Sequence, residues 1–212
     1  MKEYHKIQTV FKRDPATKHK TLLEGDYSIP AFGYLAKNKW VFTEKIDGTN
    51  IRVNFENGVV TFGGRTDNAQ IPAFLVQKLM EIFTVEKLAA IFPEGNACLF
   101  GEGYGARIQK GGGNYIANGV GFILFDVHCG GYWLERGNVE DISAKCSVPI
   151  VPVIGSGTML DAVERTRIGF PSLVGNCIAE GIVMRPLVEL LDRDRHRVIS
   201  KIKHKDFAPR AN

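Results

Sequence analysis

Five short segments of the chain carry side chains that could act on a phosphate group. A neutral lysine amine can attack phosphorus as a nucleophile. Further cations, and carboxylates that hold a divalent metal, stabilise the negative charge that gathers on the transferred group. Taken singly, each residue has a plainer interpretation as a solvated lysine, a turn glutamate or the wet face of a strand. The candidates are Lys45 in TEKIDGTN, Arg65 in GGRT, Glu102 in FGEGYG, Glu180 in EGIVMR, and Lys201 and Lys203 in SKIK.

The elements around Lys45 are predicted to be two strands with a tight turn. Apolar and polar residues alternate in WVFTEKI (40–46) and again in NIRVNF (50–55), with Asp47-Gly48 between them. Asp-Gly between alternating segments is typical of a β-hairpin. We therefore expect a hairpin that presents Lys45, and a second one at Asn57-Gly58.

The remaining pattern predicts an α+β fold with largely antiparallel sheets and flanking helices. Strands outnumber helices and do not alternate with them regularly, which argues against a doubly wound fold. Thr84 and Asn138 are predicted to be helix N-caps. Further strands are expected at 59–64, 97–105, 119–127, 130–134, 148–155, 178–186 and 196–204, and helices at 71–83, 84–92, 138–146 and 158–168.

The length of the chain predicts one domain, or one domain with a small appendage. Residues 1–38 are polar and turn-rich, and we expect them to form an N-terminal extension packed on a domain of residues 39–212. No repeat, linker or C-terminal accessory domain is recognisable.

Composition is that of a protein with a substantial core. Of the 212 residues, 44% are hydrophobic and 24% charged, and the formal net charge is +4. No apolar run reaches the roughly 18 residues that span a membrane, and the N-terminus has no signal-peptide core. We expect a cytoplasmic monomer with no membrane association, and bacterial and viral origins are equally compatible. The four cysteines form no CxxC pair, so reduced thiols are expected and not a zinc site.

Several common enzyme classes are excluded by their missing motifs. GEGYGA (101–106) matches a dinucleotide fingerprint, but the RIQKGGGNY that follows cannot form the required helix. The chain contains no P-loop, no GxSxG elbow and no HExxH zinc motif.

The order of these segments resembles the covalent nucleotidyltransferase superfamily of ATP-dependent RNA ligases, DNA ligases and mRNA capping enzymes. The family's Lys-x-Asp-Gly motif is similar to Lys45-Ile46-Asp47-Gly48, and its last motif, Lys-x-Lys, to Lys201-Ile202-Lys203. Between them FGEGYG, ILFDV and EGIVMR resemble three further motifs in family order. The resemblance covers residues 43–207 and implies an adenylyltransferase domain with an ATP-grasp-like ligase fold.

Within the superfamily the chain is most similar to the RNA ligases. EKIDGTN places Glu44 before the lysine and Asn50 after the turn, where DNA ligases more often carry arginine. The Lys-x-Lys-x-x-x-Phe pattern ends at Phe207, and GGRT resembles the short arginine motif of the family.

The resemblance implies an ATP-dependent RNA ligase that joins 3′-hydroxyl and 5′-phosphate ends through a lysyl-AMP intermediate. Lys45 would be the nucleophile, aided by Lys201, Lys203 and Mg²⁺ or Mn²⁺. The other implied ATP contacts are Glu44 and Ile46 beside the nucleophile, Asn50 and Arg65 at phosphate, Glu102 at the ribose, Phe125 at adenine, and Glu180 at the metal. Arg52, Arg65 and Asn50 are expected to contact the nucleic-acid end.

Two alternatives remain open from the sequence. The first is a DNA ligase or a capping-type guanylyltransferase on the same fold, which nucleotide preference would distinguish. The second is a non-catalytic nucleic-acid-binding protein, which would bind in a salt-dependent manner without forming a covalent adduct.

Overall fold

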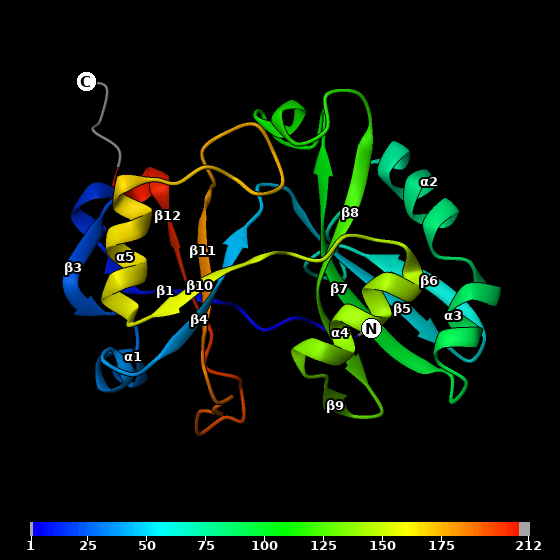
Figure 1. Ribbon diagram of the computed structural model, residues 1–212, viewed down its shortest axis with the longest axis horizontal. Coiled ribbons are helices and arrows are strands. Elements are labelled where there is room, and N and C mark those ends of the chain that lie inside the picture. The colour runs from blue at the N-terminus through cyan, green and yellow to red at the C-terminus, as the bar shows by residue number, and fades with distance from the viewer. Residues whose placement is uncertain (1, 208–212) are drawn as a thin grey trace. The chain divides into compact units, whose positions relative to one another are not determined.

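The computed structural model describes residues 2–207 (Figure 1). The chain forms two compact units. Unit 1 contains the residues up to Tyr4 together with Asp47–Val151, and unit 2 contains His5–Ile46 and the residues from Pro152 onward. The chain therefore passes between the units three times, and one passage directly follows Ile46.

Unit 1 is built on a five-stranded antiparallel sheet with the order β6-β5-β7-β8-β9. Its helices are α2 (Ala73–Ile82), α3 (Val85–Ile91) and α4 (Arg136–Cys146), with a 3₁₀ turn η2 (Gly112–Asn114). The strands are β5 (Thr49–Glu56), β6 (Val59–Gly63), β7 (Asn96–Gly105), β8 (Val120–Cys129) and β9 (Tyr132–Trp133).

The core of unit 1 is formed by apolar residues that recur every second position on β5 and every fourth position on α2. Ile51, Val53 and Phe55 alternate along β5 and are buried on one face of the sheet. Leu75 and Leu79 lie one turn apart on α2 and are buried in the same cluster. Side chains two apart on a strand and four apart on a helix share a face, so the pattern of the sequence specifies this packing.

Unit 2 is built on a second five-stranded sheet with the order β1-β12-β11-β4-β10. The pair β1–β12 is parallel and the other pairs are antiparallel. The strands of this sheet are β1 (Gln8–Thr9), β4 (Trp40–Lys45), β10 (Val153–Gly157), β11 (Gly181–Pro186) and β12 (Ser200–Lys203). Two further strands, β2 (Phe11–Arg13) and β3 (Leu22–Tyr27), form a separate antiparallel pair. The helical segments are η1 (Pro15–Thr17), α1 (Pro30–Leu35), α5 (Met159–Ile168) and η3 (His204–Asp206).

One face of the unit 2 sheet is buried and the other is partly exposed. Trp40 and Phe42 of β4 are buried in a core cluster that includes Ala162 of α5. Helix α5, yellow in Figure 1, packs on β11 and β12. Thr43 and Lys45 alternate with the buried residues and are only half-buried. This second face carries the side chain of Lys45.

The predicted α+β class with largely antiparallel sheets is confirmed. Residues 1–38 contain more regular structure than their polar composition suggested, namely β1, β2, β3, α1 and η1. Tyr4 belongs to unit 1, and β1 adds a strand to the main sheet of unit 2. The segment is thus part of both units.

The hairpin expected at Asp47-Gly48 is wrong, whereas the one at Asn57-Gly58 is confirmed. β4 pairs with β10 and β11, and β5 pairs with β6 and β7, so the strands around Asp47-Gly48 lie in different sheets. Asn57 and Gly58 have φ of 51° and 73°, as a type I′ turn requires, and Gly48 is not among the glycines with positive φ. Gly48 is required for another reason, given below.

One predicted helix cap is confirmed and one is wrong. The Thr84 hydroxyl accepts a hydrogen bond from the backbone N–H of Lys87 at 3.3 Å. Asn138 lies inside α4, because that helix already begins at Arg136.

All four cysteines are free, as expected. Burial raises the pKa of the Cys98 thiol to about 12 and that of the Cys146 thiol to about 11, so neither is a reactive thiolate at neutral pH. Among residues 2–207, no helix is long and apolar enough to cross a membrane.

Candidate active site

Strand register in unit 2 brings two of the predicted lysines to either side of one glycine. Lys45 is the last residue of β4 and Lys203 the last residue of β12, and both pair with Gly181 of β11. Glu180 directly precedes Gly181. Because neighbouring strands lie about 4.8 Å apart, its side chain is within reach of both lysines.

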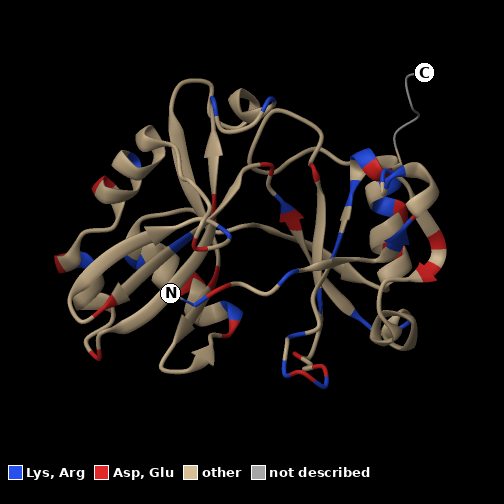
Figure 2. Ribbon diagram, turned by 180° about the vertical axis from the view of Figure 1, so that it is seen from behind, with Lys and Arg blue, Asp and Glu red and all other residues tan. Residues whose placement is uncertain are grey.

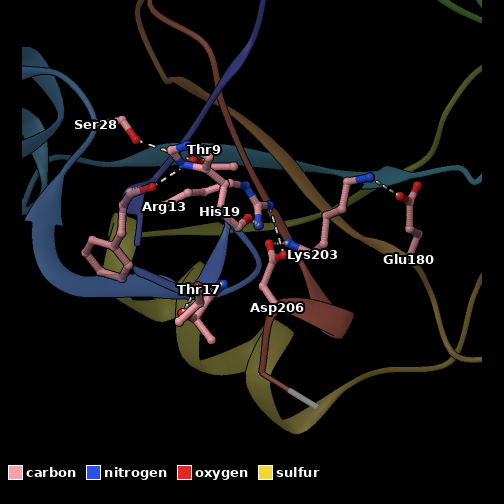
Figure 3. Close-up of polar contacts among 10 residues, drawn as sticks. Thr9, Arg13, Thr17, His19, Ser28, Glu180, Lys203 and Asp206 are labelled. Carbon is pink, nitrogen blue, oxygen red and sulfur yellow. Dashed lines mark hydrogen bonds and ion pairs between the residues drawn. The ribbon is translucent and has the colours of Figure 1, made fainter. Parts of the chain in front are cut away.

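The three side chains form a double ion pair. Lys45 Nζ lies 2.6 Å from Glu180 Oε2, and Lys203 Nζ lies 2.7 Å from Glu180 Oε1. Figure 3 shows the Lys203 side chain extended toward Glu180. The Lys45, Lys203 and Glu180 side chains are 18%, 21% and 11% exposed. The group is therefore partly desolvated but open enough to meet a ligand.

The charge state of Glu180 follows from this arrangement. Burial alone would raise the pKa of its carboxyl group. The attraction of Lys45 and the hydrogen bonds from Lys203 and Lys45 outweigh that effect and hold the pKa below its ordinary value. Glu180 is thus an anion at neutral pH.

The same face of the sheet carries two further cations. Lys201 lies two residues before Lys203 and pairs with Val183, so the two lysines share a face as predicted. Arg185 lies two residues beyond Val183 on β11 and is half-buried on that face. Arg185 is not among the residues predicted for the site, although the alternation in EGIVMR places it on this face. Figure 2 shows basic positions in blue along the strands of this sheet.

Glu44 points away from Lys45, to the buried face of β4. Its side chain is buried, and its carboxylate accepts hydrogen bonds from the Ser172 hydroxyl and, at 2.8 Å, from the Leu173 backbone N–H. The Ser172 hydroxyl in turn accepts bonds from the N–H groups of Val174 and Gly175. Glu44 therefore anchors the loop 172–175.

Ile46, the other neighbour of Lys45, is an apolar residue of the interior. It is 3% exposed.

In unit 1, Glu102 lies against the turn that follows the lysine motif. It is an interior residue of β7, and its Cα pairs with that of Asn50. A Cβ on Gly48 would meet the Gly103 carbonyl oxygen at 2.4 Å and Glu102 Cγ at 2.7 Å. Glycine at position 48 is thus required by this close approach. The Asn50 Oδ1 atom is buried without a hydrogen-bond partner among the described residues, which favours a bound donor there.

The same turn is held by two residues of the glycine-rich segment QKGGGNY (109–115). The Asp47 N–H donates to the Tyr115 hydroxyl at 3.3 Å, and Gln109 Nε2 donates to the Gly48 carbonyl at 3.0 Å. Neither Tyr115 nor Gln109 was predicted to be a site residue, because nothing in QKGGGNY indicates a contact with Asp47 or Gly48.

Phe125 is the extra residue of a β-bulge in β8. Phe100 pairs with Asp126 and Gly101 with Leu124, so the register skips Phe125. A bulge re-aims the side chain of the extra residue. Tyr4 packs edge-on against the Phe125 ring, with centroids 5.3 Å apart at 84°.

The two predicted substrate arginines differ in accessibility. The Arg52 side chain is 0% exposed, and its guanidinium donates to the Gly64 carbonyl at 2.6 Å and to Asp67 at 2.8 Å. It fixes the loop that follows β6 and cannot reach a ligand in this arrangement. Arg65 lies on that loop and is exposed.

Two other features contain none of the predicted site residues. A pocket of about 460 Å³ between α2 and residues 106–120 contains none of the predicted site residues. Among residues 2–207, the side chains of Asp192, Asp194 and His196 lie close enough together to bind one metal ion, and this group does not include Glu180.

The fold of the chain is similar to that of solved RNA ligase structures. The structure is similar to that of Naegleria gruberi RNA ligase with PPi, with a TM-score of 0.64 and 18% identity over 96% of this chain and 56% of that chain. It is also similar to a lysine-to-alanine mutant of that ligase with ATP and Mn, with a TM-score of 0.65 and 20% identity over 96% of this chain and 59% of that chain. At this identity the likeness shows a shared fold, and the chain spans less than two thirds of the length of these ligases.

The family itself is shown by the sequence match. No curated protein matches the chain. The RNA ligase family model matches residues 38–203, which is more than half of the sequence and includes every predicted site residue. The chain belongs to the RNA ligase family.

Proposed function

We propose that this protein is an ATP-dependent RNA ligase in which Lys45 becomes covalently adenylylated. The observation that carries the proposal is the double ion pair, with Lys45 and Lys203 on opposite oxygens of Glu180 at 2.6 and 2.7 Å. These three residues occupy the first, last and fourth motif positions of the resemblance. An amine, a second cation and a carboxylate in direct contact are the groups that nucleotidyl transfer needs.

The proposed reaction has three steps. Lys45 Nζ attacks the α-phosphorus of ATP, so that a P–N bond forms, the bond to the bridging oxygen breaks and pyrophosphate leaves. AMP then passes to the 5′-phosphate of an RNA end, which releases Lys45. The 3′-hydroxyl of the second end attacks that phosphate and AMP leaves, closing the strand.

The first step requires Lys45 to leave its ion pair. An amine paired with a carboxylate is held as the ammonium ion, and only the neutral amine is nucleophilic. A lysine has an unperturbed pKa of about 10.4, so a proton must be lost before attack. Lys201, Lys203 and Arg185 would then bind the phosphate oxygens and stabilise the charge that develops there.

Glu180 would hold a divalent cation once Lys45 is released. Mg²⁺ keeps several water ligands and needs few protein carboxylates, so a single glutamate with phosphate oxygens fits that ion, as it fits Mn²⁺. When bound, the cation would neutralise charge on the phosphates. The similar ligase structures that contain ATP and Mn support this choice.

The remaining proposed contacts come from the resemblance. Glu102 would bind the ribose hydroxyls, Phe125 would stack on adenine, and Asn50 would accept a hydrogen bond from the nucleotide at its unpaired Oδ1 atom. Glu44 would contact the nucleobase only after it released Ser172 or Leu173. Arg65 would bind the 5′-phosphate end, and we propose that Arg52 acts indirectly, by fixing the loop that carries Arg65.

The test is incubation with ATP radiolabelled at the α-phosphate and Mg²⁺, followed by a denaturing gel. Lys45→Ala should abolish the labelled band, and Lys39→Ala, an exposed lysine on the same segment, should retain it. Nicked RNA and DNA duplexes added to labelled protein then identify the strand that is sealed.

Each other outcome points to one of the alternatives. Labelling by GTP in place of ATP would indicate a guanylyltransferase, and sealing of DNA alone would indicate a DNA ligase. A folded, initially unadenylated protein that takes no label would refute the ligase mechanism and favour a nucleic-acid-binding role.

A further inference from the structure

The end of strand β12 is fixed by a contact that lies outside the motifs. Lys203 is the last residue of β12, and its ammonium group bonds Glu180 at 2.7 Å. Its backbone N–H donates to Asp206 Oδ2 at 3.3 Å, which closes the short turn η3. Together with the bond from the His204 N–H to the Glu180 carbonyl at 2.8 Å, the Asp206 side chain fixes the backbone from which the Lys203 side chain extends.

Asp206 is itself held by an arginine that is distant in the sequence. The Asp206 side chain is 3% exposed, and its Oδ1 accepts a hydrogen bond from Arg13 Nη2 at 2.9 Å (Figure 3). Arg13 lies at the end of β2 and also donates to the His19 carbonyl at 3.3 Å. A buried carboxylate without a partner is costly, so the bond from Arg13 holds the Asp206 side chain in place.

We propose that Arg13 and Asp206 are positioning residues for Lys203 in the adenylylation of Lys45, an inference that rests on the proposed function. The contacts run without interruption from Arg13 to Asp206, from Asp206 to the Lys203 backbone, and from the Lys203 side chain to Glu180, which holds Lys45. Loss of the arginine would release the end of β12 and let Lys203 leave Glu180.

A neighbouring ion pair provides the comparison. Lys12, adjacent on β2, pairs with Asp26 at 2.7 Å, and both side chains are about half exposed. Exposed pairs of this kind contribute little to stability. Lys12→Gln therefore removes a similar charge from the same strand without disturbing Lys203.

The first measurement is competitive acetylation of lysines, read by mass spectrometry of peptides. Lys203 is protected by its bond to Glu180, and Lys205, two residues along and exposed, reports the intrinsic reactivity. In Arg13→Gln we expect Lys203 acetylation to rise about fivefold relative to Lys205, the factor given by the loss of one ordinary hydrogen bond. Arg13→Lys should restore most of the protection, and Lys12→Gln should leave it unchanged.

The second measurement is the rate of Lys45 labelling at saturating ATP. Arg13→Gln should lower it about tenfold, since a charge-assisted contact is misplaced, and Lys12→Gln should not. If Arg13→Gln does not fold, Asp206→Asn is used in its place to break the same contact. Thermal unfolding shows whether each variant is folded.

Two results would overturn the inference. The first is a folded Arg13→Gln protein in which Lys203 acetylation and Lys45 labelling both equal those of the wild type. The second is slower Lys45 labelling with unchanged Lys203 acetylation, which would mean that Arg13 contributes only to stability. Absence of labelling in the wild-type protein would instead refute the proposed function, and the acetylation contrast would still decide whether Arg13 holds Lys203.

Discussion

Replacement of Glu180 by glutamine tests whether the double ion pair stabilises unit 2. Glutamine has nearly the same shape but no charge, so the two ammonium groups of Lys45 and Lys203 lose their common counter-ion. Wild-type contacts of 2.6 and 2.7 Å are charge-assisted hydrogen bonds. We expect the Glu180→Gln protein to be clearly less stable than the wild type at neutral pH.

The magnitude follows from the geometry and the exposure. A hydrogen bond to a charged group contributes about 1.5–3 kcal/mol. Glutamine keeps one weaker acceptor, and the lysine side chains, 18% and 21% exposed, regain part of their hydration. The buried carboxylate also no longer pays its desolvation cost. We therefore expect the free energy of unfolding to fall by about 2 kcal/mol, less than for a fully buried pair.

The loss should depend on pH in a defined direction. The folded-state pKa of Glu180 lies below its ordinary value of 4.5. A group of this kind stabilises the folded state fully above the unfolded-state pKa, and this stability is lost as the pH falls through the folded-state pKa. The difference between wild type and Glu180→Gln should thus be complete at pH 7 and shrink progressively below pH 4.5.

Urea unfolding of both proteins at several pH values measures this difference. Trp40 is fully buried in unit 2, so its fluorescence in a Trp133→Phe background reports that unit. Glu164→Gln, which removes an exposed pair with Arg167, is the control and should change stability by less than about 0.5 kcal/mol. A Glu180→Gln effect that is equally small, or that persists unchanged at acid pH, would refute the reasoning.

Three further substitutions have expected outcomes. Gly48→Ala puts a Cβ 2.4 Å from the Gly103 carbonyl oxygen, so both the unfolding temperature and Lys45 labelling should fall; wild-type values would contradict the close approach. Tyr4→Phe removes the donor at 2.7 Å to the buried Asp126 carboxylate and should cost about 1–3 kcal/mol in urea unfolding, a smaller loss indicating that water replaces the hydroxyl. Arg65→Ala, at an exposed position, should leave stability unchanged but slow the sealing of nicked RNA by protein that is already adenylylated, as measured in a gel assay; equal sealing would exclude it as an end-binding residue.

Local chemistry allowed several features to be predicted from the sequence. Period-two alternation placed Lys201 and Lys203 on one face of β12, and the Asn57-Gly58 pair specified its turn because both residues accept positive φ. Thr84 capped its helix because a hydroxyl there meets a free backbone N–H. Each of these depends on residues within a few positions of one another.

Other features depended on contacts that no local pattern contains. The alternation around Asp47-Gly48 was correct for two strands but said nothing of their partners, and Lys45 of β4 pairs with Gly181 of β11, 136 positions away. The side of β4 that carries Glu44 became the buried one because α5 and its apolar residues cover that face. Arg52 is buried because a loop of its own unit closes over it.

The sequence by itself determined the α+β class, the ends of the strands that carry the lysines, and the order of the motifs that indicates an RNA ligase. The tertiary structure decided that Glu180 lies between Lys45 and Lys203, and that Arg13, 193 positions from Asp206, secures the end of β12. The physical reason is that alternation and turn chemistry act over a few residues, whereas the partner of each charge is chosen by strand register and by the cost of leaving a buried charge unpaired.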